Sequence, residues 1–331
     1  MSIGNLENYS EIVEENLENC LTSISAEIKP LHSGKVRESY EIDNNSLALV
    51  TTDRQSAFDR ILASVPFKGQ VLNMTSAWWF KKTNHIINNH LISVPDPNVS
   101  IVKKCKPFPV EFVVRGYITG SSNTSLWVNY DNGIRRYCGT VFPDGLIKNQ
   151  KLENVVITPT TKSDQGDVPI SPEEILEQGL MSKPHWDFCS AKAVELFKYG
   201  QQEAEKKGLI LVDTKYEMGL SEKGQILLID EVHSPDSSRY WRLSTYKKMH
   251  KAGKEPENID KEFLRLWFKE NCDPYNDPKL PKAPKELIVE LSIRYIQLFE
   301  QITGSKLQFN NCQTHLQKRI NELLISLINS E

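Results

Sequence analysis

Three charged side chains alternate inside an apolar segment in the second half of the chain. Asp213, Lys215 and Glu217 lie two residues apart within residues 209–218, which are otherwise rich in Leu, Ile and Val. In a β-strand, side chains with this spacing point to the same face. Charges on one strand face usually mean contact with solvent, but the dense apolar residues around these three favour a functional site.

A second apolar segment, residues 225–232, follows after a short polar turn and contains Asp230 near its end. If the two segments form a hairpin with a two-residue turn, Asp230 lies opposite Lys215 and diagonal to Glu217. Two carboxylates at that separation can share one cation. Because they supply few of the ligands that Mg²⁺ needs, the pattern is typical of a magnesium ion that also binds a nucleotide.

Two arginines lie where an anion could bind. Residues 234–239, SPDSSR, are small and turn-forming and end in Arg239, a composition expected of a loop that closes around an anion. Arg115 lies in the apolar strand of residues 111–122, where an unpaired guanidinium would be costly. Its partner is either a structural carboxylate or a ligand phosphate that it binds together with Ser121.

Small and basic residues near the N-terminus form another candidate anion site. Residues 33–37, SGKVR, lack the longer glycine frame of a Walker loop, yet Gly34 beside Lys35 and Arg37 could hold a phosphate group. Further along the chain, a polar cluster interrupts apolar residues and comprises Asp53, Arg54, Ser56 and Asp59. A capped turn would also explain this cluster, so a substrate contact and a structural role both stay open.

The remaining candidates bear on proton and phosphoryl transfer. Lys162 follows another predicted strand and brings a further cation. His233 lies between the predicted metal strand and the SPDSSR loop, where it could accept a proton or hydrogen-bond the loop. No Cys or Ser nucleophile with an adjacent general base is evident, so we do not expect covalent catalysis by the protein.

The elements that position these residues mix strands and helices. Besides the strands above, strands are expected at residues 47–51 and from residue 155. A capping box predicts a helix that begins after Ser171. Hydrophobic periodicity predicts further helices at about residues 10–25, 70–88, 185–207, 260–270, 284–303 and 313–329.

Length and charge restrict the class of protein. With 331 residues, the chain exceeds the usual size of a single core, so two lobes are expected. A net charge of −3 argues against a general nucleic-acid-binding protein. No apolar run approaches the roughly 20 residues that cross a bilayer, and the acidic N-terminus does not resemble a signal peptide. We therefore expect a cytoplasmic protein whose six scattered cysteines are reduced thiols.

Seven motifs, in this order, resemble the SAICAR synthetase (phosphoribosylaminoimidazole-succinocarboxamide synthase) family of purine biosynthesis. They are GKVRESYEI, TTDRQSAFDR, FKGQVLNMTSAWWF, VVRGYITGS, ITPTTKSD, DTKYEMG and IDEVHSPDSSRYW. The resemblance implies a two-lobed α+β fold related to ATP-grasp enzymes and kinases, with ATP in the cleft between the lobes. We predict that residues 1–112 form the first lobe, residues 113–255 form the lobe with the metal and substrate site, and residues 256–331 form an appended C-terminal helical segment.

The resemblance also implies an activity and a set of site residues. The enzyme would join the carboxylate of carboxyaminoimidazole ribonucleotide (CAIR) to the amine of L-aspartate, while ATP is cleaved to ADP and phosphate. Carried over onto the matching motifs, the ATP phosphates would contact Gly34, Lys35 and Arg37, and Mg²⁺ would bind to Glu217 and Asp230. The 5′-phosphate of CAIR would bind to Arg115, Ser121 and Arg239, and its ribose side to Asp236. The reacting centre would be lined by Lys162 and Lys215, and the substrates would lie near Asp53, Arg54 and Ser56.

Two residues depart from the family pattern. Gln55 stands where an apolar residue is expected, and Phe67 precedes Lys68 where glycine is usual. Neither belongs to the predicted metal pair or phosphate site. The runner-up function is a small-molecule kinase on the same scaffold, and a third is a non-catalytic nucleotide sensor. Aspartate-dependent release of ADP distinguishes the ligase from both, and a monomer or small homo-oligomer is expected.

Overall fold

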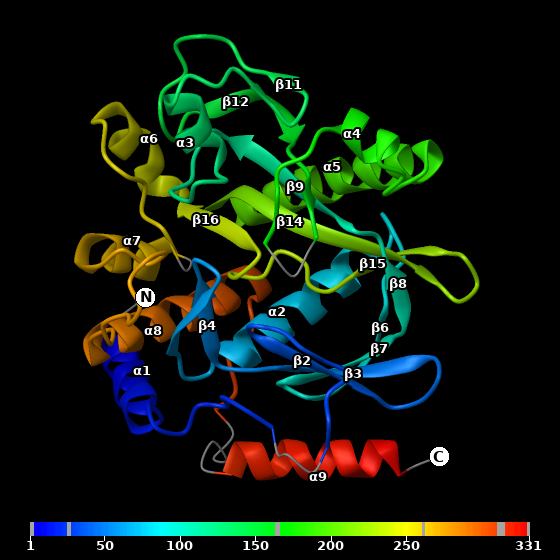
Figure 1. Ribbon diagram of the computed structural model, residues 1–331. Helices are drawn as coiled ribbons and strands as arrows, with labels where there is room; N and C mark the ends of the chain where they lie inside the picture. Colours follow the sequence, from blue (N-terminus) through cyan, green and yellow to red (C-terminus); the bar gives the residue numbers. More distant parts are fainter. Residues whose placement is uncertain (1–2, 25–27, 163–165, 260–261, 310–314, 330–331) are drawn as a thin grey trace.

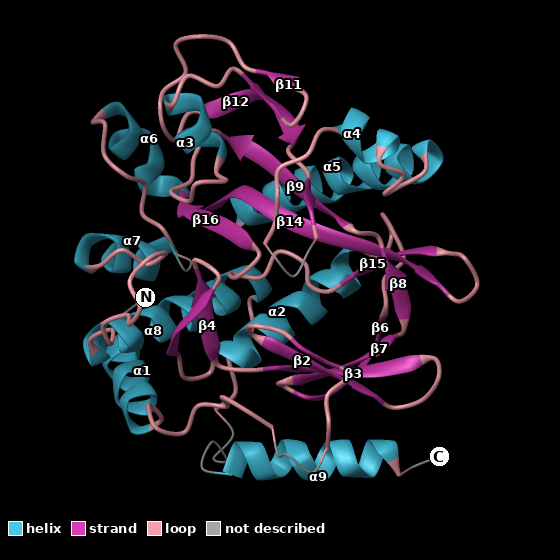
Figure 2. Cartoon of the chain, in the orientation of Figure 1, coloured by secondary structure: helices cyan, strands magenta, loops and turns pink. Residues whose placement is uncertain are grey.

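Two antiparallel sheets with flanking helices form the body of the protein (Figures 1 and 2). The structure, a computed structural model, describes residues 3–24, 28–162, 166–259, 262–309 and 315–329. The first sheet has the order β1-β2-β3-β7-β6, with bounds β1 His32–Ser33, β2 Arg37–Glu41, β3 Ser46–Thr51, β6 Leu91–Asp96 and β7 Val99–Lys103. A separate hairpin joins β4 (Arg54–Ala57) to β5 (Arg60–Ser64).

The second sheet contains the strands that carry Glu217, Arg115 and Arg239. Its order is β12-β9-β14-β15, and β8, β13 and β16 pair with β14 or β9. The bounds are β8 Cys105–Pro107, β9 Val110–Tyr117, β12 Lys151–Ile157, β13 Thr160–Thr161, β14 Leu209–Ser221, β15 Ile226–Ile229 and β16 Ser238–Arg242. A small hairpin joins β10 (Arg136–Tyr137) to β11 (Thr140–Val141). The long strand β14 thus lies at the centre of the sheet.

The helices cover the sheets and fill the space between them (Figure 1). Their bounds are α1 Ile3–Glu15, α2 Lys68–Thr83, α3 Leu126–Asp131, α4 Pro172–Glu177, α5 Lys183–Lys206, α6 Leu243–Lys251, α7 Glu262–Asn271, α8 Lys285–Thr303 and α9 Leu316–Ile328. The predicted capping box is confirmed, since Ser171 and Glu174 each accept a hydrogen bond from the other's backbone N–H. Among the described residues, no helix is both long and apolar enough to cross a membrane.

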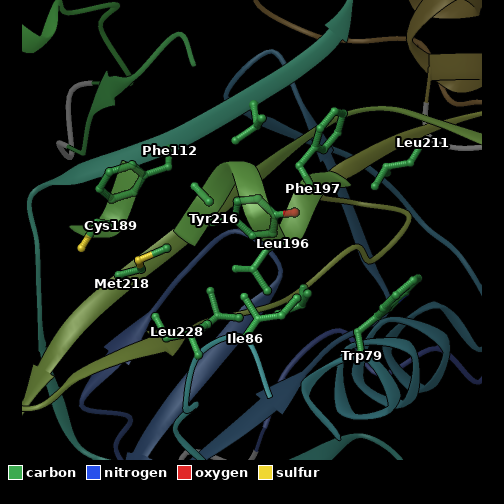
Figure 3. Packing of buried hydrophobic residues seen from close by; sticks show 14 of the residues in the cluster. Trp79, Ile86, Phe112, Cys189, Leu196, Phe197, Leu211, Tyr216, Met218 and Leu228 are labelled. Carbon is green, nitrogen blue, oxygen red and sulfur yellow. The ribbon is translucent and has the colours of Figure 1, made fainter. Parts of the chain in front are cut away.

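The largest hydrophobic cluster joins the second sheet to helices from both halves of the chain. Phe112 of β9 and Tyr216 of β14 are buried against Phe197 of α5 (Figure 3). Trp79 of α2 belongs to the same cluster, so the helix behind the first sheet also packs against the second. Burying each such side chain stabilises the fold by about 1.5–3 kcal/mol. Trp79, which is fully buried, is therefore a core residue.

The C-terminal helices pack onto the N-terminal part of the chain. Helix α8 shares a hydrophobic cluster with α1 and α2, in which Tyr295 and Leu291 are fully buried. Helix α9 places Ile320 and Leu324 against Val50 and Tyr40 of the first sheet. The division at residues 112 and 255 stays a prediction, but the hydrophobic clusters cross both of its boundaries.

The structure corrects two expectations for local structure. The first helix ends at Glu15 rather than extending to about residue 25, because Leu21 donates its backbone N–H to Asp53 Oδ2 and its carbonyl accepts from the Asp53 backbone. The β14–β15 hairpin has a longer turn, closed by a hydrogen bond from Ser221 N to Gln225 O. Glu217 therefore pairs with Ile229, one residue away from the expected register, and Asp230 follows the strand.

Candidate active site

Lysine and carboxylate side chains form a network of ion pairs on one face of β14. Lys215 Nζ donates to Glu111 Oε1 at 2.6 Å and to Glu217 Oε1 at 3.0 Å, and Lys162 Nζ donates to Glu217 Oε2. Burial opposes the charge of Lys215, but Glu217 and Glu111 outweigh it and raise the pKa of the ammonium well above its usual value. The structure thus brings the predicted lysines and Glu217 into one contact network with Glu111, and Lys215 is firmly protonated.

A second group of charges connects the first sheet to the end of β15. Arg37 of β2 donates to Asp230 through Nη1 and to Glu231 Oε2 through Nη2, the latter at 3.2 Å. Burial alone would raise the pKa of Asp230, but Arg37, Lys215 and Lys162 together lower it. Asp230 also adopts a left-handed backbone, with φ of 63°. This conformation ends the strand and leaves an ionised carboxylate between the two sheets.

The predicted metal pair can be tested against this geometry. In the parts of the chain that the structure describes, no group of three or more His, Cys, Asp or Glu side chains could hold a metal ion. Glu217 supplies one carboxylate from β14 and Asp230 a second from just after β15, each held by cationic side chains. Such a pair fits Mg²⁺ that takes its other ligands from nucleotide phosphates and water, rather than a metal enclosed by protein.

Two arginines flank one carboxylate at the other end of β14. The register pairs Asp213 with Arg115 of β9 on one side and with Arg239 of β16 on the other. Arg115 Nη1 lies 3.4 Å from Asp213 Oδ2, Arg239 Nη1 donates to the same oxygen, and Arg115 Nε donates to Thr158 Oγ1 at 2.8 Å. Arg115 therefore has a structural carboxylate as partner. Asp213 alone balances one of the two guanidinium charges, so a second anion can be accommodated here.

Ser121 and Arg239 contact the same carboxylate. The Ser121 hydroxyl donates to Glu262 Oε1, and Arg239 Nη2 donates to Glu262 Oε2 at 3.4 Å. The predicted set of Arg115, Ser121 and Arg239, which we call the phosphate clamp, is thus connected through Asp213 and Glu262. No pattern in the sequence pointed to Glu262, which comes from α7 in the C-terminal part of the chain.

The SGKVR segment forms a turn whose backbone is held by Arg54. Arg54 Nε donates to Lys35 O at 2.9 Å, Nη2 to Gly34 O at 3.0 Å, and Nη1 to Glu38 Oε1 at 2.8 Å. Lys35 itself reaches outward and pairs with Asp59, with both side chains more than half exposed. These contacts give Arg54 a structural role, and a substrate contact by it stays a prediction.

Asp53 and Ser56, the polar residues near Arg54 in the sequence, have different surroundings. Asp53 is fully buried and accepts backbone N–H groups from Gly69 at 2.8 Å and Leu21 at 2.7 Å. Burial raises its pKa to about 6, although these hydrogen bonds and Lys68 lower it. Ser56 is half-buried in β4. Asp53 therefore has a structural role, but through backbone groups distant in the sequence rather than through a local capped turn, whereas the predicted role of Ser56 stays open.

Asp236 lies beside two residues whose chemistry the sequence had not explained. Lys68 Nζ is 3.5 Å from Asp236 Oδ2, its side chain is fully buried, and it has no hydrogen-bond partner among the described residues. Gln55 Nε2 lies 3.5 Å from Asp236 Oδ1, and Tyr295 donates to Gln55 Oε1 at 3.2 Å. Gln55 thus connects Asp236 to α8, which explains why this position carries a polar residue.

Phe67 occupies a backbone conformation that favours glycine. Its φ of 63° lies in the left-handed region at the start of α2. The ring is buried and packs edge-on against Phe309 at 5.1 Å between ring centroids. This aromatic contact offsets the backbone strain and explains how phenylalanine can replace the glycine that is usual in the family.

His233 serves the core rather than the reacting centre. It is fully buried, its Nε2 bonds the hydroxyl of Tyr216, and Trp79 packs edge-on at 4.6 Å between ring centroids. Tyr240 donates to the His233 carbonyl at 2.8 Å. Burial lowers the pKa of the imidazole to about 3. The imidazole therefore bonds a residue of β14 rather than the SPDSSR loop, and the structure supports neither of the two roles left open by the sequence.

This burial predicts acid sensitivity of the fold. His233 has a lowered pKa in the folded state, so the unfolded chain binds more protons once the pH falls below about 6.5. Between pH 7 and 5 we expect this residue to remove roughly 2 kcal/mol of unfolding free energy. Urea unfolding at both pH values should show a smaller pH dependence for His233→Gln than for the wild type. His32→Gln, which changes an exposed histidine, is the control. Equal dependence in all three proteins would contradict the prediction.

One signal in the sequence, a charged residue in or next to an apolar strand, could have identified several further site residues. Glu111 is a charged residue in the same apolar strand as Arg115, and Glu231 follows Asp230 directly. Lys68 lies in the motif FKGQ, but no role was predicted for it. Each of these side chains has a charged neighbour of opposite sign in or near the site.

Comparison with known proteins identifies the family of the chain. The SAICAR synthetase family model matches residues 30–281. A phosphoribosylaminoimidazole-succinocarboxamide synthase of Legionella pneumophila (strain Paris) is 61% identical over 292 residues, which cover 88% of this chain and 93% of the relative. The fold resembles the SAICAR synthase of Saccharomyces cerevisiae in complex with SAICAR, with a TM-score of 0.74, 33% identity and coverage of 87% of this chain and 99% of that one.

A second solved structure, a SAICAR synthetase in complex with ADP, has a TM-score of 0.65 and 25% identity and covers 84% of this chain and 99% of its own. The family model spans well over half of the chain, and the similarity to the Legionella relative extends over nearly the whole length of that protein. The chain therefore belongs to the SAICAR synthetase family and is a ligase.

Proposed function

We propose that this chain joins CAIR and L-aspartate to give SAICAR, with ATP cleaved to ADP and phosphate through an acyl phosphate. A carboxylate oxygen of CAIR attacks the γ-phosphorus of ATP, and the bond from that phosphorus to ADP breaks. The aspartate amine then attacks the acyl carbon, the amide forms, and phosphate departs with the former carboxylate oxygen. The amine loses a proton in this step.

One observation carries this proposal: the central strand β14 connects a candidate phosphate site to a candidate metal site. Asp213, Lys215 and Glu217 lie on it two residues apart, and they contact the two arginines, Glu111 and Lys162 respectively. A strand rises about 3.3 Å per residue, so the ends of this row are roughly 13 Å apart. A ribonucleotide can then place its phosphate at one end and its carboxylate at the other.

The side chains at the metal end suit phosphoryl transfer. Glu217 and Asp230 would hold Mg²⁺, which when bound would supply positive charge for phosphoryl transfer. Lys215 and Lys162 bring two ammonium groups to the point where the carboxylate and γ-phosphate would meet, and Arg37 brings a guanidinium group from the first sheet. These cations pair with Glu217, Glu111 and Asp230, which keeps them in position before substrates bind.

The same proposal includes three further points. ATP binds between the two sheets, the fold is related to ATP-grasp enzymes and kinases, and Asp236 contacts the ribose. The likeness to a SAICAR synthetase solved with ADP supports the use of a nucleotide. A cytoplasmic location and a monomer or small homo-oligomer remain expectations. Release of ADP with CAIR and L-aspartate each omitted in turn separates this ligase from a kinase, which would not require aspartate.

An oxygen-18 experiment tests the acyl phosphate. We expect CAIR labelled in its carboxylate to transfer one labelled oxygen to the released phosphate, because that oxygen leaves bound to phosphorus. Mass spectrometry of the phosphate measures the transfer, and unlabelled CAIR in labelled water is the control. Phosphate without label from CAIR would mean that water hydrolyses ATP, and the ligase mechanism proposed above would be wrong.

A further inference from the structure

A carboxylate of the protein occupies the phosphate clamp. Glu262 accepts a hydrogen bond from Ser121 Oγ through Oε1, and its Oε2 lies 3.4 Å from Arg239 Nη2. The side chain is buried, with 8% of its surface exposed. Lys269, further along the same helix α7, donates to the backbone carbonyl of Ser121. Helix α7 is therefore docked against the clamp at two points.

Glu262 is ionised in this environment. Burial disfavours its charged form, but Arg239, Arg265 and the Ser121 hydroxyl outweigh that effect and lower its pKa to about 2. The two arginines of the clamp then face two carboxylates, Asp213 and Glu262. An incoming phosphate dianion would meet both negative charges at short range, so one of them must move away.

Geometry decides which carboxylate can move. Asp213 lies inside β14 and is paired with β9 on one side and β16 on the other. Glu262 is the first residue of α7 and already has a second partner, since Arg265 Nη1 lies 3.4 Å from Glu262 Oε2. Arg265 Nε is buried without a hydrogen-bond partner in the described part of the chain, so this guanidinium can take more of the carboxylate.

We propose that Glu262 is an internal anion that fills the clamp between turnovers and yields to the substrate phosphate by turning toward Arg265. The inference rests on the proposed function, in which Arg115, Ser121 and Arg239 bind the 5′-phosphate. Glu262 keeps the arginines paired and oriented until substrate arrives, which avoids the cost of buried, unpaired cations. It also makes the clamp selective, because only a ligand with a phosphate group can replace it.

The first experiment removes the negative charge of Glu262. Glu262→Gln retains an oxygen that can accept from Ser121 but no longer competes with a dianion. If Glu262 fills the clamp about 90% of the time, its neutralisation should tighten the binding of a phosphate ligand about 10-fold. Calorimetry with ribose 5-phosphate and with CAIR measures the dissociation constants. Glu270→Gln, at an exposed position of the same helix, is the matched control and should bind both ligands as the wild type does.

A second variant separates displacement from a simple change of charge. Arg265→Met removes the partner toward which Glu262 turns, so it should weaken ribose 5-phosphate binding, and adding Glu262→Gln to it should restore that binding. If Arg265 instead contacts the phosphate directly, the double variant stays weak and the proposal is overturned. Thermal unfolding of each variant confirms that the fold is retained.

The outcomes also distinguish this inference from the proposed function. If the wild type binds both phosphate ligands but Glu262→Gln binds them equally or more weakly, Glu262 is a fixed part of the clamp and the placeholder role is refuted. If neither protein binds ribose 5-phosphate or CAIR, the clamp does not hold the substrate phosphate, and the proposed site assignment fails together with the inference.

Discussion

Glu217→Gln and Asp230→Asn should each lower turnover by orders of magnitude while the fold persists. Each change keeps the shape of the side chain and removes one negative charge from the candidate magnesium site. Glu217 contacts Lys162 and Lys215, and Asp230 contacts Arg37. Each carboxylate therefore also pairs with cations that would face ATP. ADP release at saturating CAIR, aspartate and ATP measures the loss.

The magnesium dependence separates a metal ligand from a residue that only positions lysines. A lost ligand should raise the magnesium concentration needed for half-maximal rate, whereas a positioning defect should lower the rate at every magnesium concentration. Glu41→Gln is the matched control, because Glu41 forms an exposed ion pair with Lys104 outside the site. Near-normal activity of either site variant at limiting magnesium would exclude that residue as a ligand.

Arg239→Ala should weaken CAIR binding roughly 30-fold or more and leave the ATP requirement little changed. Removing one charge-assisted contact to a buried anion typically costs ~2–5 kcal/mol, which corresponds to this loss or a larger one. Arg239 also pairs with Asp213 and Glu262, so its loss leaves two buried carboxylates with fewer partners. Calorimetric titration with CAIR and with ATP, each alone, measures the two affinities separately.

Arg242→Ala provides the control on the same strand. Arg242 ends β16, its side chain is 42% exposed and it pairs with Glu257, so its removal deletes a similar side chain outside the clamp. Arg239→Lys retains the charge and tests whether the forked guanidinium is required. If ATP affinity collapses in Arg239→Ala and CAIR affinity does not, the arginine belongs to the nucleotide site instead.

Local signals in the sequence were sufficient for most helices and for the family. The helix at residues 284–303 ends where predicted, because Gly304 adopts the left-handed conformation that closes a helix. The long helix α5 likewise ends next to Gly208. These signals act within a few residues along the chain, and the motifs preserve the order of the site residues. Both can therefore be read without knowledge of the fold.

Contacts between distant segments could not be predicted in the same way. The position of Asp230 depended on a turn that is longer than two residues, and a shift of one residue in a hairpin changes which side chains face each other. Arg37 pairs with Asp230 and Glu231, which lie 193 and 194 residues away in the sequence. Neither the turn length nor this pairing leaves a local trace.

The sequence by itself determined which charges this protein carries on β14 and in the SPDSSR loop, because strand periodicity and loop composition are properties of adjacent residues. Only the tertiary structure decided which charges neutralise one another. It placed His233 in the core, Lys68 beside Asp236, and Glu262 between Ser121 and Arg239. These outcomes follow from burial, which makes every buried charge require a partner, and that partner is supplied by whichever segment the fold brings close.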